Sequence, residues 1–370
     1  MRSLSAHKPD YTLLGLFAVL ICFGFIMLVS ASSPLGYERF GDHYFFVKRQ
    51  FFLGFLPGLL GFLFFSKIPY GFLKKLGTLL FYVSLILLIA VLVPGIGVEH
   101  GTFARSWLNI GSISFQPAEI MKLGLIFFLS AHLSKIGNGI ENFSHGFLPT
   151  LAIGFFSIGL LILQPDIGTA SILFTIIFGI LFLAKAKISH LGGLLTVACL
   201  AFVIMILVAP YRAARITTFL HPERDPQGIG YHIQQASIAI GSGGVFGLGY
   251  GHSRQKFQYL PEVHADSIFA IIAEEMGFVV AGALIILFLL IFLRGFHLAR
   301  SAPDDFGKYL VSGILIWFAV QACFNIFAML GLMPITGVPL PFVSHGGTAL
   351  AIALSAVGVL SNVSRHTRSL

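Results

Sequence analysis

The chain has 370 residues, of which 56% are hydrophobic and only 10% are charged. Soluble globular domains carry about 25% charged residues, so this composition excludes a soluble fold and predicts an integral membrane protein. The formal net charge of +8 comes from Lys and Arg near the ends of apolar segments rather than from basic blocks, which argues against a nucleic-acid-binding protein.

Ten apolar segments are long enough to cross a bilayer as helices, which predicts an all-α polytopic membrane protein. We expect residues 1–370 to form a single integral membrane domain. The length of the first segment and the many spans after it favour an uncleaved helix over a signal peptide. The predicted spans are residues 11–33, 46–66, 73–94, 117–135, 147–164, 167–184, 188–209, 267–293, 308–331 and 346–363.

The basic residues of the short loops predict that both termini are cytoplasmic, because such loops are retained on that side. A large outer loop, residues 210–266, then lies between the seventh and eighth spans. The other outer segments are residues 95–116, 164–168 and 332–345. Neither a Walker nor a Rossmann glycine pattern is present in a strand–helix context, so neither ATP nor NAD is indicated. The three cysteines lie inside apolar segments, which argues against disulfides and a metal cluster.

Residues 115–122 open the fourth span, where Pro117 suits the first turn of a helix. Glu119 and Lys122 are three positions apart, so they share a helix face and can pair. A charge inside a membrane helix is costly unless it is paired or faces a wet cavity. Two interpretations stay open: a structural ion pair, or the wall of a polar cavity that orients a substrate.

Asp166 lies in a tight turn, residues 164–168, between the fifth and sixth spans. Aspartate is a good helix N-cap, and this structural role is favoured over a role in a site.

The outer loop 210–266 contains several kinds of segment. It begins with a basic amphipathic patch (residues 211–216), and a short helix is predicted over residues 231–240. The glycine-rich run 241–251 could expose N–H groups to a phosphate, although a flexible connection would explain it equally well.

Residues 255–266 concentrate polar side chains where the eighth span emerges. Asp266 is a candidate general base, since such a base must be held by a rigid element, although helix N-capping is the alternative. Burial would raise its pKa, whereas Lys256 or an arginine would lower it, so both directions stay open. His264, Asp266 and His252 could form a metal site, but their spacing is not diagnostic. Farther along the span, at least one of Glu274 and Glu275 should face water or the protein interior.

The last outer segment, residues 333–348, is rich in proline and should be stiff and extended. Ser344 and the small residues after it then begin the tenth helix, with N–H groups suited to an anionic head group.

Four separated motifs make the chain resemble the FtsW/RodA/SpoVE family of bacterial envelope proteins, the SEDS family. The sequence of residues 253–262 is more similar to the division branch (FtsW) than to the elongation branch (RodA). The motifs are residues 104–109 together with 115–122, residues 164–169, residues 239–277 and residues 337–347.

The resemblance implies an inverting peptidoglycan glycosyltransferase that polymerises lipid II at the outer face of the cytoplasmic membrane during septal wall synthesis. Its expected partners are a class B penicillin-binding protein transpeptidase and other divisome membrane proteins. The family's essential aspartate falls on Asp266, and its cavity Glu and Lys fall on Glu119 and Lys122. The chain departs from the usual pattern at Ala265, Ser267 and His345.

Such a reaction needs a base for the attacking hydroxyl and cations for the leaving pyrophosphate. The cations would be Arg105, Lys256, Arg212 or Arg215, or a divalent ion such as Mg or Mn. The candidate substrate-binding residues are Arg105, Gln116, Glu119, Lys122, Asp166, Lys256, Glu262, His264 and Ser344.

Two rival functions remain. A lipid II flippase or a permease could use the same buried polar residues as a translocation path, although no internal repeat is evident. A scaffold that only recruits the transpeptidase would not need Asp266 at all.

Overall fold

The computed structural model describes residues 7–98, 105–111, 113–208, 210–222, 225 and 228–367. The prediction of an all-α polytopic membrane protein is confirmed. Within these residues, nine helical segments are long and apolar enough to cross a membrane, and the shorter apolar helix Ile167–Leu183 brings the total to ten. That the chain is one domain stays a prediction.

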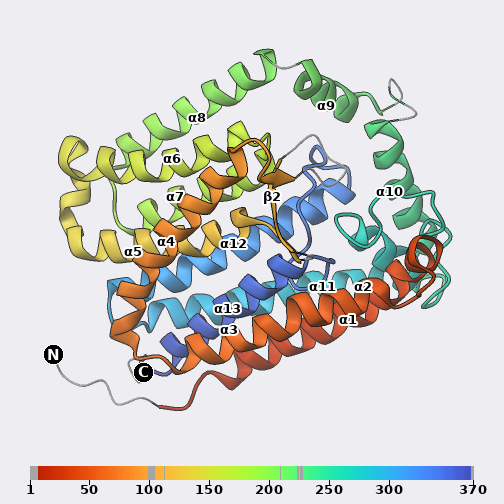
Figure 1. The fold of residues 1–370 in the computed structure, drawn as a ribbon, viewed down its shortest axis with the longest axis horizontal. Helices are drawn as coiled ribbons and strands as arrows, with labels where there is room; N and C mark the ends of the chain where they lie inside the picture. Colours follow the sequence, from red (N-terminus) through yellow and green to blue (C-terminus); the bar gives the residue numbers. More distant parts are fainter. Residues whose placement is uncertain are drawn as a thin grey trace.

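The spanning helices pack into one bundle with α12 and α13 in its middle and α8 at its edge (Figure 1). Residues 45–67 form one helical segment with a π-helical turn, η1, in its centre. The helices are α1 (Tyr11–Phe40), α2 (Phe45–Gln50), η1 (Phe51–Phe55), α3 (Leu56–Lys67), α4 (Tyr70–Leu92), α5 (Pro117–Ile136), η2 (Gly137–Glu141), η3 (Phe143–Phe147), α6 (Leu148–Leu163), α7 (Ile167–Leu183), α8 (Ile188–Val208), α9 (Pro210–Leu220), α10 (Ile229–Gly243), α11 (Ile268–Arg300), α12 (Asp305–Met329) and α13 (Gly347–Ser364).

Two helices are longer than predicted. α1 continues to Phe40 and α11 to Arg300, because a helix can extend past the hydrocarbon layer until something ends it. α1 ends at Gly41, whose φ of 68° is left-handed and whose N–H bonds to the carbonyl of Tyr37. The apolar pattern alone does not predict where such a helix ends.

A small antiparallel sheet was not predicted. Its strands are β1 (Gly97–Val98), β2 (Trp107–Ile110) and β3 (Ile113–Phe115), in the order β1-β2-β3. Leu108 pairs with Gly97 on one side and with Phe115 on the other. The sheet brings the chain to the start of α5.

The two ends of the described chain lie together (Figure 1). The N–H of His7 donates to the carbonyl of Arg365 at 2.9 Å, and the N–H of Asp10 donates to the hydroxyl of Ser364 at 3.1 Å. The termini therefore share one face of the bundle, as an even number of spans requires. α13 has 18 residues and is therefore about 27 Å long, so the segment before its first residue lies near the opposite face.

The glycine-rich run, residues 241–251, supplies backbone hydrogen bonds where α11 is interrupted. Gly277 has non-helical angles (φ 73°, ψ −177°), which interrupts the hydrogen bonds of the helix. The N–H groups of Phe278 and Val279 donate instead to the carbonyls of residues 244 and 245, and the carbonyls of residues 274 and 275 accept from the N–H groups of residues 248 and 249. A broken helix is tolerated at membrane depth when other protein groups satisfy its backbone. The run is thus part of the helix packing, and these N–H groups are not available to a phosphate.

Glycine is required where the two segments cross. A Cβ on Gly247 would lie 2.2 Å from the carbonyl oxygen of Glu275, and one on Gly277 would lie 2.3 Å from the nitrogen of Gly247. Both residues also have positive φ, which glycine adopts without strain.

Candidate functional site

Residues 332–346, called the last outer loop after the side of the membrane predicted for it, are the centre around which the predicted site residues gather. They lie between the end of α12 and the start of α13. A Cβ on Gly337 would lie 4.0 Å from Oδ2 of Asp266, and a Cβ on Gly168 would lie 2.8 Å from Val338. The loop therefore meets both the Asp266 segment and the turn before α7.

Asp266 lies just before α11 and is half-buried. Its Oδ1 atom is buried and has no hydrogen-bond partner within the described part of the chain. Burial and the negative charge of Glu262 raise the pKa of Asp266 to about 7. The sequence left the direction of this pKa shift open, and in the structure the pKa is raised. The N-cap residue of α11 is Ser267, so Asp266 does not cap this helix.

The backbone of residues 264–266 is held from outside the segment. The donors come from the last outer loop and from α12. The bonds run from the N–H of His345 to the carbonyl of His264 (2.8 Å), from the hydroxyl of Ser344 to the carbonyl of Ala265 (2.5 Å) and from Nδ2 of Asn325 to the carbonyl of Asp266 (2.7 Å).

The three departures from the family pattern are accommodated in this contact region. His345 lies in an aromatic cluster in which the ring of Phe46 is 5.3 Å from its own ring and 4.3 Å from that of His264. Burial lowers the pKa of His264 to about 4 and that of His345 to about 3, so both rings are neutral near pH 7. Ala265 contributes its carbonyl group to the contact described above.

Ser267 connects Asp266 to α10. Its hydroxyl donates to the carbonyl of Pro261 at 2.7 Å and lies 2.7 Å from Nε2 of His232. Because the hydroxyl hydrogen is used on Pro261, Nε2 of His232 must be the donor in the second bond. Burial lowers the pKa of His232 to about 4, which is consistent with a neutral ring in this tautomer.

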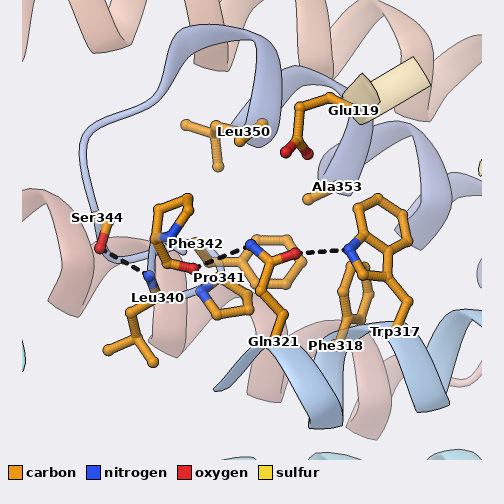
Figure 2. A pocket seen from close by; sticks show the side chains of 12 residues that line it. Glu119, Trp317, Phe318, Gln321, Leu340, Pro341, Phe342, Ser344, Leu350 and Ala353 are labelled. Carbon is orange, nitrogen blue, oxygen red and sulfur yellow. Dashed lines mark hydrogen bonds between the residues drawn. The ribbon is translucent and has the colours of Figure 1, made fainter. Parts of the chain in front are cut away.

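Glu119 and Lys122 form a buried ion pair in α5, with 2.7 Å between Nζ and Oε1. Nζ of Lys122 also donates to Oε1 of Gln321 at 2.9 Å and lies 4.9 Å from the centre of the Trp317 ring. The indole N–H of Trp317 donates to the same Gln321 oxygen, and Nε2 of Gln321 donates to the carbonyl of Pro339 in the last outer loop (Figure 2). The pair is therefore joined to the loop through α12.

A cavity of about 10 Å³ lies beside this network, with room for about one water molecule. It lies between Glu119 and the last outer loop, with Leu350 and Ala353 of α13 in its wall (Figure 2). Oε2 of Glu119 is buried and has no partner within the described residues, so one water molecule there would satisfy it.

Lys256 lies in a second buried network, in contact with α1 and α11. Its Nζ atom bonds to Oε1 of Glu275 (2.8 Å), to the hydroxyl of Ser30 (3.0 Å) and to the carbonyl of Gly251 (2.8 Å). Glu275 is fully buried, and the neighbouring Glu274 accepts hydrogen bonds from the N–H of Arg254 and the hydroxyl of Ser253. Both glutamates face the protein interior, and Lys256 is engaged there.

Gln116 and Asp166 come together from distant parts of the sequence. Nε2 of Gln116 lies 3.4 Å from Oδ2 of Asp166, and its backbone N–H donates to the hydroxyl of Thr348 at 3.3 Å. Oδ1 of Asp166 also caps α7 by accepting from the N–H of Thr169 at 3.0 Å. Asp166 thus has the capping role expected of it and, in addition, joins the starts of α5 and α7.

The remaining predicted residues differ in placement. Glu262, Arg105 and Arg215 are exposed, whereas the side chain of Arg212 lies outside the described residues. The Ser344 hydroxyl accepts from the N–H of Leu340 and donates to Ala265, so it braces the loop. Within the described ranges no group of three or more His, Cys, Asp or Glu side chains could hold a metal ion, so the suggested site of His252, His264 and Asp266 is not formed.

Several polar residues of the site escaped the sequence reasoning. Gln50, 2% exposed, donates to the carbonyl of Ser344 and accepts from the N–H of Gly346. Gln321 and Asn325 are 3% and 2% exposed and one turn apart on α12. Polar side chains inside apolar spans are candidates for function, and this rule, applied to the ninth span, would have identified Gln321 and Asn325.

Comparison with known proteins places these features in a wider group. Residues 11–369 match the model of the FtsW/RodA/SpoVE family, described as cell cycle protein. Stage V sporulation protein E of Bacillus subtilis is 41% identical over 98% of both chains. The probable peptidoglycan glycosyltransferase FtsW of Trichlorobacter lovleyi is 39% identical over 96% of this chain and 93% of its own.

Solved structures agree in fold. A chain from a study of the structural coordination of polymerization and crosslinking by a peptidoglycan synthase complex superimposes with a TM-score of 0.78 at 30% identity, covering 96% of this chain and 98% of that one. Rod shape determining protein RodA of Thermus thermophilus gives a TM-score of 0.71 at 28% identity, covering 98% of each chain.

Proposed function

Because this chain belongs to the FtsW/RodA/SpoVE (SEDS) family, we propose that it is a peptidoglycan glycosyltransferase that polymerises lipid II during septal wall synthesis. The observation that carries the proposal is Asp266, a carboxylate whose pKa is about 7 and whose Oδ1 atom has no protein partner in the described residues. A general base is most effective when its pKa lies near the working pH.

The proposed step joins two glycans. A sugar hydroxyl attacks the anomeric carbon of a lipid-linked sugar, the bond from that carbon to the pyrophosphate oxygen breaks, and the configuration inverts. Asp266 accepts the hydroxyl proton as the new glycosidic bond forms, and the electron pair of the broken bond leaves with the pyrophosphate. Burial of Asp266 suits this role, because it makes the carboxylate more basic than an exposed aspartate.

The location of Asp266 supports a substrate at the membrane surface. The residue precedes α11 and contacts the segment before α13, whereas the termini meet at the far end of α13. We propose that both termini are cytoplasmic, in which case Asp266 lies at the outer face of the cytoplasmic membrane. A lipid-linked pyrophosphate and its sugars would be presented there.

The leaving pyrophosphate needs positive charge. Lys256 is paired with Glu275 inside the protein, which makes it a poor source of that charge. Arg105, Arg212 and Arg215 remain the proposed protein cations, and of these Arg105 and Arg215 are exposed. An Mg or Mn ion, if one takes part, would find an unpartnered oxygen on Asp266 but would need the substrate phosphates to complete its coordination.

The partner that we propose is a class B penicillin-binding protein, because the solved chain with a TM-score of 0.78 comes from a peptidoglycan synthase complex in which polymerization and crosslinking are coordinated. Other divisome membrane proteins are proposed partners for the septal role. That role is supported by relatives named FtsW and by the sporulation protein.

The transport alternative is less well supported by the geometry. A translocation path through Glu119 and Lys122 would need an open polar channel, but the pair is buried and hydrogen-bonded beside a cavity of about 10 Å³. Its polar partners are Gln321 and, through Gln321, the carbonyl of Pro339.

The test uses the purified full-length chain with its class B partner and labelled lipid II. We expect glycan strands, detected as a ladder on a gel, that require this chain and do not depend on transpeptidation. If labelled lipid II instead crosses between vesicle leaflets and is never lengthened, the chain is a flippase and the polymerase proposal is wrong.

A further inference from the structure

Asn325 contacts the Asp266 segment and the last outer loop with one side chain. Its Nδ2 atom donates both hydrogens, one to the carbonyl of Asp266 at 2.7 Å and one to the carbonyl of Val338 at 2.9 Å. The residue lies on α12, a helix largely enclosed by the bundle, and is itself 2% exposed. One buried amide thus fixes two backbone segments relative to a rigid element.

This contact completes the set of bonds around the candidate base. The carbonyls of the two residues before Asp266 are held by the last outer loop, and Asn325 holds the third. Because each peptide unit is planar, fixing three successive carbonyls leaves little freedom in the backbone dihedrals that direct the Asp266 side chain.

The amide is present at a cost. Oδ1 of Asn325 is buried and has no hydrogen-bond partner within the described residues. A leucine here would remove this unsatisfied oxygen but would leave the carbonyls of Asp266 and Val338 without their donor, so the two bonds, rather than packing, account for the asparagine.

A second amide on the same helix extends the arrangement. Gln321, one turn earlier, bonds to the carbonyl of Pro339 and to Nζ of Lys122. The two amides therefore connect the buried Glu119–Lys122 pair with the loop and the loop with Asp266.

We propose that Asn325 is a positioning residue that aims the Asp266 carboxylate at the sugar hydroxyl by fixing its backbone against the last outer loop. This inference rests on the proposed glycosyltransferase function. Asn325 acts through Asp266 and touches no reacting atom. Its loss should therefore slow the chemical step more than it weakens substrate binding.

The chain provides a matched control in Asn362. Its Nδ2 atom also donates to two carbonyls, those of Phe65 (2.8 Å) and Ile68 (2.7 Å). It is 1% exposed, and its Oδ1 atom is likewise buried without a partner among the described residues. Asn362 and its two bonds lie at the C-terminal end of α13, away from Asp266.

The kinetic experiment compares Asn325→Leu and Asn362→Leu in the full-length chain, reconstituted in nanodiscs with its class B partner and lipid II. We expect kcat of Asn325→Leu to fall about a hundredfold with KM changed less than about threefold, because small misplacements of a catalytic group cost this much. Asn362→Leu should keep kcat near that of the unsubstituted chain, even if its Tm falls as far as the Tm of Asn325→Leu. Equal kcat in the two variants would overturn the proposal. If Asn325→Leu does not accumulate, Asn325→Ala replaces it.

A second measurement does not depend on polymerase activity. Hydrogen–deuterium exchange of the full chain should accelerate in peptides covering residues 255–267 and 336–346 in Asn325→Leu, and in neither of them in Asn362→Leu. Unchanged exchange in both peptides would overturn the positioning role. A chain that makes no glycan at all, yet shows this exchange pattern, would refute the proposed function while leaving the structural role of Asn325 supported.

Discussion

Replacing Asp266 with asparagine should make the protein more stable at high pH while removing its activity. The folded-state pKa of Asp266 is about 7, above the ordinary value of 3.8, so the folded chain holds this proton more tightly than the unfolded chain. Between pH 3.8 and pH 7 stability therefore falls as pH rises, and above pH 7 the full penalty is present. A shift of about 3 pKa units corresponds to about 4 kcal/mol. An asparagine side chain at this position has no proton to lose and would carry no such penalty.

The assay is thermal unfolding of Asp266→Asn and the unsubstituted chain in the same detergent, at pH 5 and pH 8. We expect the Tm of the variant to exceed that of the unsubstituted chain by several degrees at pH 8, with a much smaller difference at pH 5. Asp42→Asn is the control of opposite sign, because its hydrogen bond with Lys48 lowers the pKa of exposed Asp42 and its loss should give no stabilisation at pH 8. If Asp266→Asn has the same or a lower Tm at pH 8 than the unsubstituted chain, the fold does not raise the pKa of Asp266.

Three further predictions concern the surroundings of this residue. Glu262→Gln removes the second cause of the raised pKa of Asp266, so the acid limb of the polymerisation rate should move to lower pH without reaching the ordinary range, since burial remains; an unmoved limb would exclude this charge as a cause. Glu275→Gln leaves Lys256 buried and uncompensated and should cost about 3–5 kcal/mol in denaturant unfolding, and a loss below about 1 kcal/mol would contradict the buried pair. Gly277→Ala places a Cβ 2.3 Å from a backbone nitrogen and should lower Tm sharply. Gly282→Ala in the same helix meets nothing within 4 Å and should leave Tm unchanged or raised. Similar melting of both variants would argue against the close crossing of Gly247 and Gly277.

Much of the fold follows from hydrophobic pattern, because the bilayer requires long apolar helices and leaves few alternatives. Among the described residues, nine predicted spans are confirmed and the sixth is a shorter apolar helix; the helix within residues 231–240 and the capping role of Asp166 are also confirmed. The overlong ends of α1 and α11 were not predicted, because beyond the hydrocarbon layer only local features such as Gly41 end a helix.

The glycine-rich run shows a different limit. Its composition is compatible with phosphate binding or with a flexible connection, and the structure shows instead a backbone contact with α11. Residues 244–249 bond to the interrupted turn of α11 around Gly277. A contact between two segments that are distant in sequence and bond through backbone atoms leaves no trace in side-chain chemistry.

For the candidate site, the sequence predicts individual residues but not how they are arranged. The family resemblance supplies Asp266, and the spacing of Glu119 and Lys122 predicts their pair, which the structure contains. The central position of the last outer loop could not be predicted, because it depends on which helices are neighbours in space. Asn325 is 59 positions from the carbonyl that it holds, and the sequence does not record that proximity.

The assignment of Asp266 as the general base is tested most directly by polymerisation of labelled lipid II with Asp266→Asn in the presence of the class B partner. We expect no glycan strands from this variant, although it should still bind lipid II, melt cooperatively and associate with the partner. Strand synthesis by Asp266→Asn at the rate of the unsubstituted chain would show that another group accepts the proton.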